Sequence, residues 1–168
     1  MKIGIVSDSH GKSARLRRAM QIFIAAGADA VVHCGDICSV DDVELLSMGP
    51  SGRPQPYLVA GNMDRDRAAL RAATEQWNVR YHDEVIEVPI GEGEYLAALH
   101  GDNGTLMAEL MADSQFPYIC HGHTHQTRDE RVGMTRVINP GAIFRARPLT
   151  VAILDTETDE LTYLEVEE

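Results

Sequence analysis

The sequence has few of the residues that mark secreted or membrane-spanning proteins. Only three of its 168 residues are cysteines, an odd number that argues against a disulfide framework and for a reducing compartment. No apolar run approaches the roughly 18 residues that span a bilayer. Polar and charged residues already lie within eight positions of Met1, too early for the apolar region of a signal peptide. We therefore expect a cytoplasmic protein without a membrane partner.

Basic residues are also scarce. The chain has 15 Lys and Arg against 26 Asp and Glu, a formal net charge of −11, and no basic run interrupts this balance. Bulk attraction to a phosphate backbone is therefore disfavoured, and we expect no polymeric nucleic acid as partner.

The acidic residues are concentrated at the C-terminus. Seven acids and no base lie in residues 155–168, whereas the first 154 residues hold 19 acids and 15 bases, a net charge of −4. The tail alternates apolar and polar residues around a TETDE turn, which predicts a hairpin at about 149–168. Its acids would keep an edge strand from pairing with other chains, and an acidic tail that binds a partner is the alternative.

Length and periodicity predict one α/β domain over residues 1–168. The composition is 44% hydrophobic, which is typical of a globular protein. Short apolar runs alternate with helical stretches in the first half, and strand-like segments dominate the second half, where we expect a largely antiparallel sheet. Two sheets packed face to face with helices outside follow from this pattern. The predicted strands are 2–7, 30–34, 56–61, 81–89, 94–100, 118–121 and 135–139, and the predicted helices are 12–26, 39–47, 65–76 and 104–112.

Most of the predicted strands stop at side chains that bind metals. The segments are IVSDSH, VVHCGD, YLVAGN, LAALHGD and YICHGHTH. Ligands of open α/β sheets bind beyond the carboxyl ends of strands. We expect Asp8 and His10 to share one side of an extended segment, as their spacing of two implies. The donors are oxygen and nitrogen, which suit Mn²⁺, Fe, Zn²⁺, Ni²⁺ or Co²⁺ better than Ca²⁺. The candidate ligands are Asp8, His10, Asp36, Asn62, His100, His123 and His125.

Each of these short motifs alone is weak evidence. A DxH triplet is common by chance, an HxH pair on a strand is more often a surface pair, and GD or GN is usually a turn. Five of them in sequence, each after a predicted strand, favour a metal site over five unrelated local structures.

The ordered series DSH, GD, GN, HG and GHTH resembles that of the calcineurin-like metallophosphoesterases. The short chain with NPG at 139–141 is similar to the small YfcE-type phosphodiesterases, and the resemblance covers residues 1 to about 166. It implies a four-layer αββα sandwich, in which helices flank two mixed β-sheets. It also implies two divalent metal ions at one edge, with manganese expected first and nickel, iron, zinc or cobalt as alternatives.

The same resemblance implies a role for each candidate ligand. One metal would be held by Asp8, His10, Asp36 and His125, and the other by Asp36, Asn62, His100 and His123. Asp36 would bridge the two, as a carboxylate with two oxygens can. The implied activity is hydrolysis of a small phosphodiester by in-line attack of a metal-bridging hydroxide. Catalysis would pass through Asp36, Asn62 and His100, which hold that hydroxide and position the phosphate.

The sequence departs from many relatives at two places. Met63 follows GN where many relatives have a histidine that can donate a proton to the leaving group, and a thioether cannot donate one. The YfcE-like branch also lacks that histidine, so the change indicates a substrate whose leaving group needs little acid help. The acid that many relatives place three residues after Asp36 is displaced here to Asp41 and Asp42, which we interpret as helix caps.

Several other residues have less specific patterns. We expect Cys34, Cys38 and Cys120 to pack in the core, His33 to be a core residue and His82 to lie on the surface. His121 stays open between a structural role and a contact with the ligands. We expect a fixed turn at Asn139, Pro140 and Gly141 that lines the site. Thirteen of the fifteen bases are arginines, and the two that we assign to substrate binding are Arg65 and Arg145.

Two other functions compete with the phosphodiesterase. The first is a protein-interaction scaffold on the same fold, and the second is a nuclease-like enzyme. All seven ligand positions hold competent donors, which favours an enzyme. The chain has no basic track and no added domain, which favours a small substrate. The oligomeric state stays open, and a homo-oligomer is possible.

Overall fold

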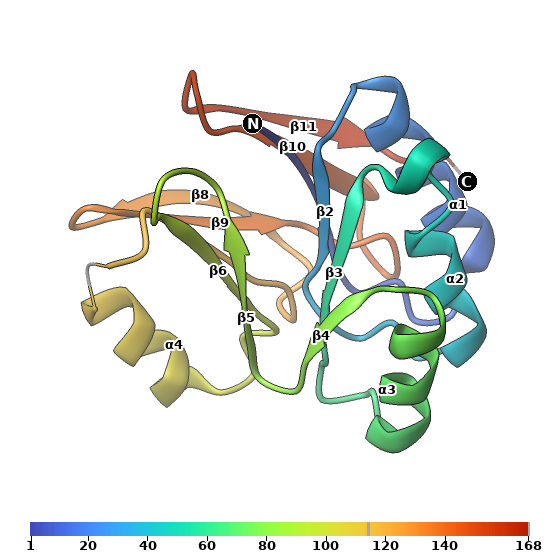
Figure 1. The fold of residues 1–168 in the computed structure, drawn as a ribbon. Coiled ribbons are helices and arrows are strands. Elements are labelled where there is room, and N and C mark those ends of the chain that lie inside the picture. Colours follow the sequence, from blue (N-terminus) through green and yellow to red (C-terminus); the bar gives the residue numbers. More distant parts are fainter. Residues whose placement is uncertain (114, 168) are drawn as a thin grey trace.

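The computed structural model describes residues 1–113 and 115–167, so Glu168 of the acidic tail lies outside the described residues. Two sheets pack face to face, with α1–α3 covering one outer side and α4 the other (Figure 1). None of the helices in the described part of the chain has the length and apolar character needed to span a bilayer.

Six strands form the first sheet, in the order β11-β10-β1-β2-β3-β4. Parallel pairing joins β1 to β2, β2 to β3 and β3 to β4, so the carboxyl ends of these strands meet at one edge. The C-terminal hairpin adds β10 and β11 antiparallel to this core. The strands are β1 (Lys2–Val6), β2 (Ala30–His33), β3 (Gln55–Val59), β4 (Arg80–His82), β10 (Thr150–Asp155) and β11 (Glu160–Glu165).

Five strands form the second sheet, in the order β5-β6-β7-β9-β8. The prediction of a largely antiparallel sheet is wrong, because β6–β7 and β7–β9 are parallel pairs whereas β5–β6 and β8–β9 are antiparallel. The sheet is therefore mixed, as the family resemblance implied. Its strands are β5 (Val85–Pro89), β6 (Tyr95–Leu99), β7 (Tyr118–Cys120), β8 (Thr127–Val132) and β9 (Thr135–Pro140).

Three apolar cores hold the layers together. The central core lies between the sheets and includes Ile5 of β1 and Leu96 of β6. A second core joins the first sheet to α1–α3 through residues such as Phe23, and a third joins β6, β7 and β9 to α4 through Met107. This confirms the four-layer αββα arrangement. The helices are α1 (Ser13–Ala25), α2 (Val43–Leu46), α3 (Arg67–Gln76) and α4 (Gly104–Ala112).

The predicted strand 81–89 is two strands that belong to different sheets. The chain leaves the first sheet after His82 and enters the second at Val85. The ring Nδ1 of His82 accepts the backbone N–H groups of Glu84 and Val85, both at 3.2 Å, and so stabilises the turn between the sheets. The turn residues Asp83 and Glu84 include no glycine or proline to mark a break, which is why the sequence concealed it.

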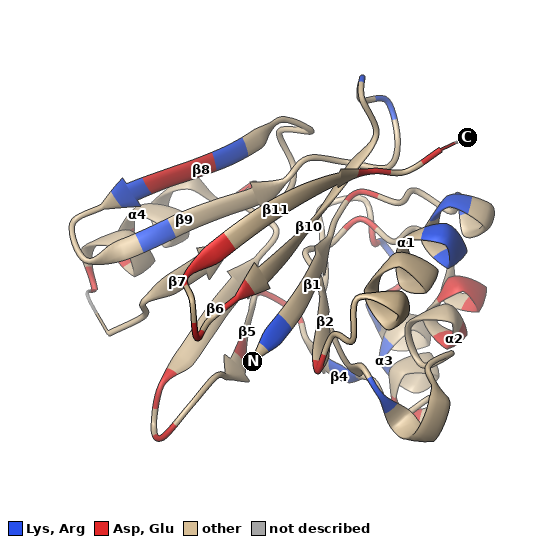
Figure 2. Cartoon of the chain, turned by 90° about the horizontal axis from the view of Figure 1, so that it is seen from above, with Lys and Arg blue, Asp and Glu red and all other residues tan. Residues whose placement is uncertain are grey.

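Two further predictions about local structure are wrong. Strand β8 was missed because its sequence, TRDERV, is charged along its length, as suits an exposed edge strand (Figure 2). The predicted helix 39–47 is a 3-10 turn at Val40–Asp42 followed by α2, and neither N-cap side chain, Ser39 or Asp42, makes a capping hydrogen bond. The capping role that we assigned to Asp41 and Asp42 is therefore not what the structure shows.

Candidate metal centre

The seven predicted ligands follow strands from both sheets at one edge of the sandwich. Asp8 and His10 follow β1, Asp36 follows β2 and Asn62 follows β3. In the second sheet, His100 directly follows β6, and His123 and His125 follow β7. The loops after β1 and β2 are joined by backbone hydrogen bonds, including that from the His10 N–H to the Asp36 carbonyl at 2.9 Å.

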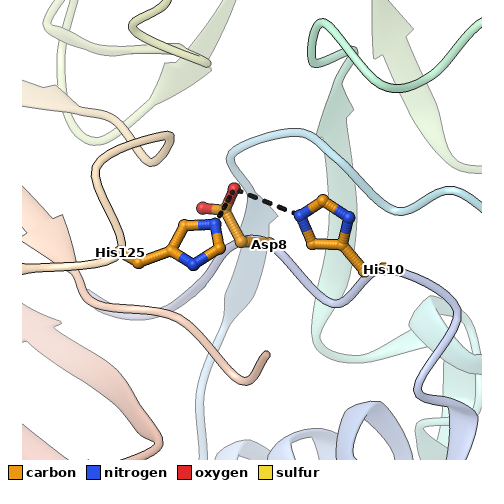
Figure 3. Close-up of side chains that lie close together, drawn as sticks. All are labelled: Asp8, His10 and His125. Carbon is orange, nitrogen blue, oxygen red and sulfur yellow. Dashed lines mark ion pairs between the residues drawn. The ribbon is translucent and has the colours of Figure 1, made fainter. Parts of the chain in front are cut away.

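Asp8 is buried and lies between two of the histidines (Figure 3). Its Oδ2 accepts hydrogen bonds from the Ser7 hydroxyl at 2.6 Å and the backbone N–H of His123 at 3.0 Å. Its Oδ1 lies 3.2 Å from Nε2 of His125 and 3.8 Å from Nε2 of His10. One carboxylate oxygen is thus held by the protein, and the other faces two ring nitrogens.

Asp36 shows the same division between its two oxygens. Its Oδ1 accepts the backbone N–H of Met63 at 2.8 Å. Its Oδ2 lies 3.5 Å from Nε2 of His10 and 3.4 Å from Nε2 of His100, so it stands between the two histidines. Burial acts to raise the pKa of Asp36, but hydrogen bonds with His100 and with the Met63 N–H lower it overall. Asp36 therefore presents an ionised oxygen to both sides of the cluster.

His100 also has one ring nitrogen held by the backbone and the other directed at the cluster. Its Nδ1 lies 2.8 Å from the carbonyl oxygen of Cys34, to which an Nδ1–H donates. That contact leaves Nε2 directed at Asp36 and at Oδ1 of Asn62, which is 2.9 Å away. A backbone carbonyl that fixes the far nitrogen in this way is typical of metal-binding histidines. His123 packs edge-on against His100, with ring centroids 5.1 Å apart.

The backbone at Asp8 and His10 differs from our expectation. The segment is not extended, because φ is +53° at Asp8 and +45° at His10, in the left-handed region. The same region is occupied by Asp36, His123 and His125, with φ of +56°, +66° and +57°. Non-glycine residues rarely adopt this conformation, and such strain concentrates at functional sites. The side chains converge through these loop conformations and not through strand alternation.

Two glycines allow the motif loops to touch one another. A Cβ at Gly122 would stand 1.8 Å from the Ser7 hydroxyl oxygen, so only glycine permits the close approach of the GHTH loop to Asp8. A Cβ at Gly61 would stand 2.1 Å from Oδ1 of Asp36. Each of these glycines thus brings one motif loop into contact with another.

Asp64 is a structural residue of the site that the sequence analysis did not identify. It is 5% exposed, and its carboxylate accepts three backbone N–H groups, from Asp36 at 2.9 Å, Gly61 at 2.8 Å and Cys38 at 2.7 Å. It therefore joins the loops after β2 and β3 and fixes the position of Asp36. This role follows no particular spacing in the sequence, so no motif marks it.

Asn139 and His121 support the GHTH loop from β9 and β7. The Asn139 amide donates to the Gly122 carbonyl at 2.9 Å and lies 3.1 Å from the Thr124 hydroxyl oxygen, and its Oδ1 accepts the N–H of Gly141 at 2.9 Å. His121 is buried, with Nδ1 3.3 Å from the Asn139 amide nitrogen. Burial lowers the pKa of His121. These contacts favour the structural alternative for His121.

His33 is a buried core residue, as expected. Its Nε2 lies 2.9 Å from the hydroxyl oxygen of Ser9, and burial lowers its pKa from 6.5 to about 3. The folded protein thus excludes a proton that the unfolded chain binds below pH 6.5. Stability contributed by neutral His33 is present in full above pH 6.5 and is lost as the pH falls toward about 3.

We therefore expect His33→Gln to flatten the acid limb of the stability profile. In the wild-type protein this one group should lower the free energy of unfolding by roughly 1 kcal/mol per pH unit between the two pKa values. Urea denaturation of wild type and His33→Gln at several pH values from 7 down to about 4.5 measures the slope. Equal slopes in wild type and His33→Gln would contradict the assignment.

The three cysteines do not share one environment. Cys34 and Cys120 are buried, as expected, but the expectation of core packing is wrong for Cys38, which is exposed. The Sγ of Cys38 lies 3.4 Å from Nδ1 of His10. Desolvation and the nearby carboxylates of Asp64 and Asp36 raise the pKa of Cys38 to about 12, so its thiol stays protonated.

Most arginines of the described chain pair with acids or backbone carbonyls, but two near the site differ. Arg65 has no hydrogen bond or ion pair with residues 1–113 or 115–167. Arg145 stacks on Phe144, with its guanidinium carbon 5.0 Å from the ring centroid. Phe144 in turn lies 4.6 Å from the His10 ring, measured between centroids, and Lys12 approaches the same aromatic ring. Two cations therefore lie close to His10.

The donor atoms suit divalent metal ions. Ligand atoms of Asp8, His10 and His125 lie within 4.8 Å of one another, as do those of Asp8, Asp36 and His100. Within the described residues, Oδ1 of Asp8 and Nε2 of His10 are buried without a hydrogen-bond partner, which is costly unless another group satisfies them. Imidazole nitrogens with carboxylate oxygens form the donor set of a transition-metal site.

Comparison with known proteins agrees with this geometry. A family model described as the calcineurin-like phosphoesterase superfamily domain matches residues 1–159. Phosphodiesterase MJ0936 of Methanocaldococcus jannaschii is 30% identical over 163 residues, which cover 95% of this chain and 96% of that protein. A solved archaeal phosphodiesterase has a TM-score of 0.85 at 29% identity, covering 98% of this chain and 99% of that one. YfcE, a phosphoesterase from E. coli, shares the fold, with a TM-score of 0.66 at 20% identity over 99% of this chain and 100% of that one.

Proposed function

Because the chain belongs to the calcineurin-like phosphoesterase superfamily, we propose that it is a dinuclear metal-dependent phosphodiesterase acting on a small phosphodiester. The observation that carries this proposal is that the two polar atoms of each of three buried side chains have different partners. Asp8, Asp36 and His100 each have one polar atom fixed by a protein hydrogen bond and the other directed at the cluster. Within the described residues, Oδ1 of Asp8 has no hydrogen-bond donor and faces only the ring nitrogens of His125 and His10, an arrangement that a shared cation would satisfy.

For each metal ion we propose the set of ligands that the family resemblance implied. One divalent ion would be held by Asp8, His10, Asp36 and His125, and the other by Asp36, Asn62, His100 and His123. Support for Asp36 as the shared ligand comes from its Oδ2, which lies at nearly equal distances from the Nε2 atoms of His10 and His100. Manganese is the ion that we propose first, with nickel, iron, zinc or cobalt as alternatives.

The chemistry divides between the ions and the side chains. Bound divalent ions supply a Lewis acid for phosphoryl oxygens and lower the pKa of a water molecule for in-line attack on phosphorus. Asp36, Asn62 and His100 position the reacting phosphate. Arg65 and Arg145 place planar guanidinium groups beside the cluster without acidic partners in the described residues, and such groups suit phosphate oxygens.

Metal-dependent hydrolysis of bis-p-nitrophenyl phosphate tests this function. We expect activity to disappear after chelation and to return with Mn²⁺, and parallel additions of Ni²⁺, Zn²⁺ or Co²⁺ rank the ions. His123→Ala removes one proposed ligand and should lower activity by about a hundredfold. A metal-loaded wild type that is no faster than His123→Ala would instead favour the interaction scaffold.

A further inference from the structure

A small hollow opens beside the proposed metal ligands on the side of β2 and β3. Its volume is about 190 Å³, and its apolar lining includes Ile37, Val40, Met63 and Leu70, with Arg65 also at its wall. Met63 is 42% exposed and Val40 is 39% exposed, so both apolar side chains present surface to solvent at the hollow. An apolar hollow with exposed hydrophobic side chains is a candidate binding site.

Two residues that line the hollow also contact proposed metal ligands. The backbone N–H of Met63 donates to Oδ1 of Asp36 at 2.8 Å, so the side chain of Met63 begins beside a proposed bridging ligand. Cys38 also lines the hollow, and its Sγ lies 3.4 Å from Nδ1 of His10. A phosphate held at the cluster would therefore have one of its ester groups within reach of this hollow.

The acidic side chains around the hollow do not oppose an apolar occupant. The Asp64 carboxylate already accepts three backbone N–H groups, and the Asp66 carboxylate accepts the N–H of Ala69 at 3.0 Å as the N-cap of α3. Arg65 is left as the unpaired charge at the wall among the described residues, and it is complementary to a phosphate. The volume is below the roughly 300–1,000 Å³ of pockets that enclose a whole drug-sized ligand, so the hollow suits one ring-sized group.

We propose that this hollow binds an apolar, ring-bearing ester group of the substrate, so that the enzyme prefers phosphodiesters with one such group over small alkyl diesters. This inference rests on the proposed function for the phosphate and adds the class of ester group. Met63 and Val40 are its specificity-determining residues.

Binding of two phosphonates tests the hollow without requiring turnover. Calorimetry of the Mn²⁺-loaded protein should give a dissociation constant about fivefold or more lower for phenylphosphonate than for methylphosphonate. Met63→Ala and Val40→Asn should each remove most of this ring preference, and both positions are exposed enough to tolerate the change. Met134→Ala, at a methionine that is 79% exposed elsewhere on the surface, is the matched control and should keep the preference.

Hydrolysis of two diesters distinguishes the role of the hollow from the hydrolytic function itself. Met63→Ala should raise the KM for bis-p-nitrophenyl phosphate several-fold more than the KM for methyl p-nitrophenyl phosphate. If both diesters are hydrolysed but phenylphosphonate binds no more tightly than methylphosphonate, the proposed role of the hollow is wrong and the proposed function stands. A ring preference that depends on Met63 in a protein without hydrolytic activity would support the hollow and contradict the proposed function.

Discussion

Asp36→Asn is expected to lower metal-dependent phosphodiester hydrolysis by about a hundredfold to a thousandfold while the protein stays folded. An asparagine oxygen can still accept the N–H of Met63, so the local hydrogen bond is kept. The amide nitrogen that replaces Oδ2 cannot bind a cation, and it would face both His10 and His100. One substitution thus removes an anionic donor from both proposed metal positions.

Two measurements distinguish this effect from a general loss of structure. The steady-state rate with saturating Mn²⁺ reports the reaction, and the rise in thermal unfolding temperature on addition of Mn²⁺ reports binding. Both should fall in Asp36→Asn, whereas Asp113→Asn, the same change at an exposed acid near the end of α4, should leave both unaltered. Asp36→Asn with more than about a tenth of the wild-type rate would argue against a bridging role.

The site could be predicted from the sequence mainly because its ligands follow the ends of predicted strands. Asp36, Asn62 and His100 follow glycine-flanked strand ends, and parallel pairing brings such ends together whatever the intervening sequence. That is why five short motifs predicted one cluster. The backbone conformation at Asp8 and His10 was not predictable in the same way, because it depends on contacts with Gly35, Asp36 and Ile37 that lie far along the chain.

Asp64 and β8 show a different limit of the sequence. Asp64 acts by accepting N–H groups from two loops, a role that needs no particular spacing and leaves no motif. Strand β8 is charged and exposed along one edge, so it lacks the alternation by which strands are predicted. Both features depend on tertiary packing, which the local sequence pattern does not reveal.

Gly61→Ala tests whether close contact between two loops builds the site. The new Cβ would stand 2.1 Å from Oδ1 and 2.4 Å from the backbone nitrogen of Asp36. A flexible side chain could move away, but the backbone nitrogen is fixed by its hydrogen bond to Asp64. Gly61 is not among the residues with positive φ, so the contact, and not the conformation, opposes the substitution.

We expect Gly61→Ala to lower the free energy of unfolding by about 1–3 kcal/mol and to weaken Mn²⁺ binding by tenfold or more, because Asp36 must shift to make room. Gly104→Ala is the matched control, since a Cβ at the start of α4 meets nothing within 4 Å. That control should be as stable as the wild type or up to about 1 kcal/mol more stable, because alanine favours helix. Urea denaturation and Mn²⁺ titration of both variants provide the comparison. If Gly61→Ala is destabilised but binds Mn²⁺ with unchanged affinity, the position of Asp36 does not depend on the packing of the loop after β3.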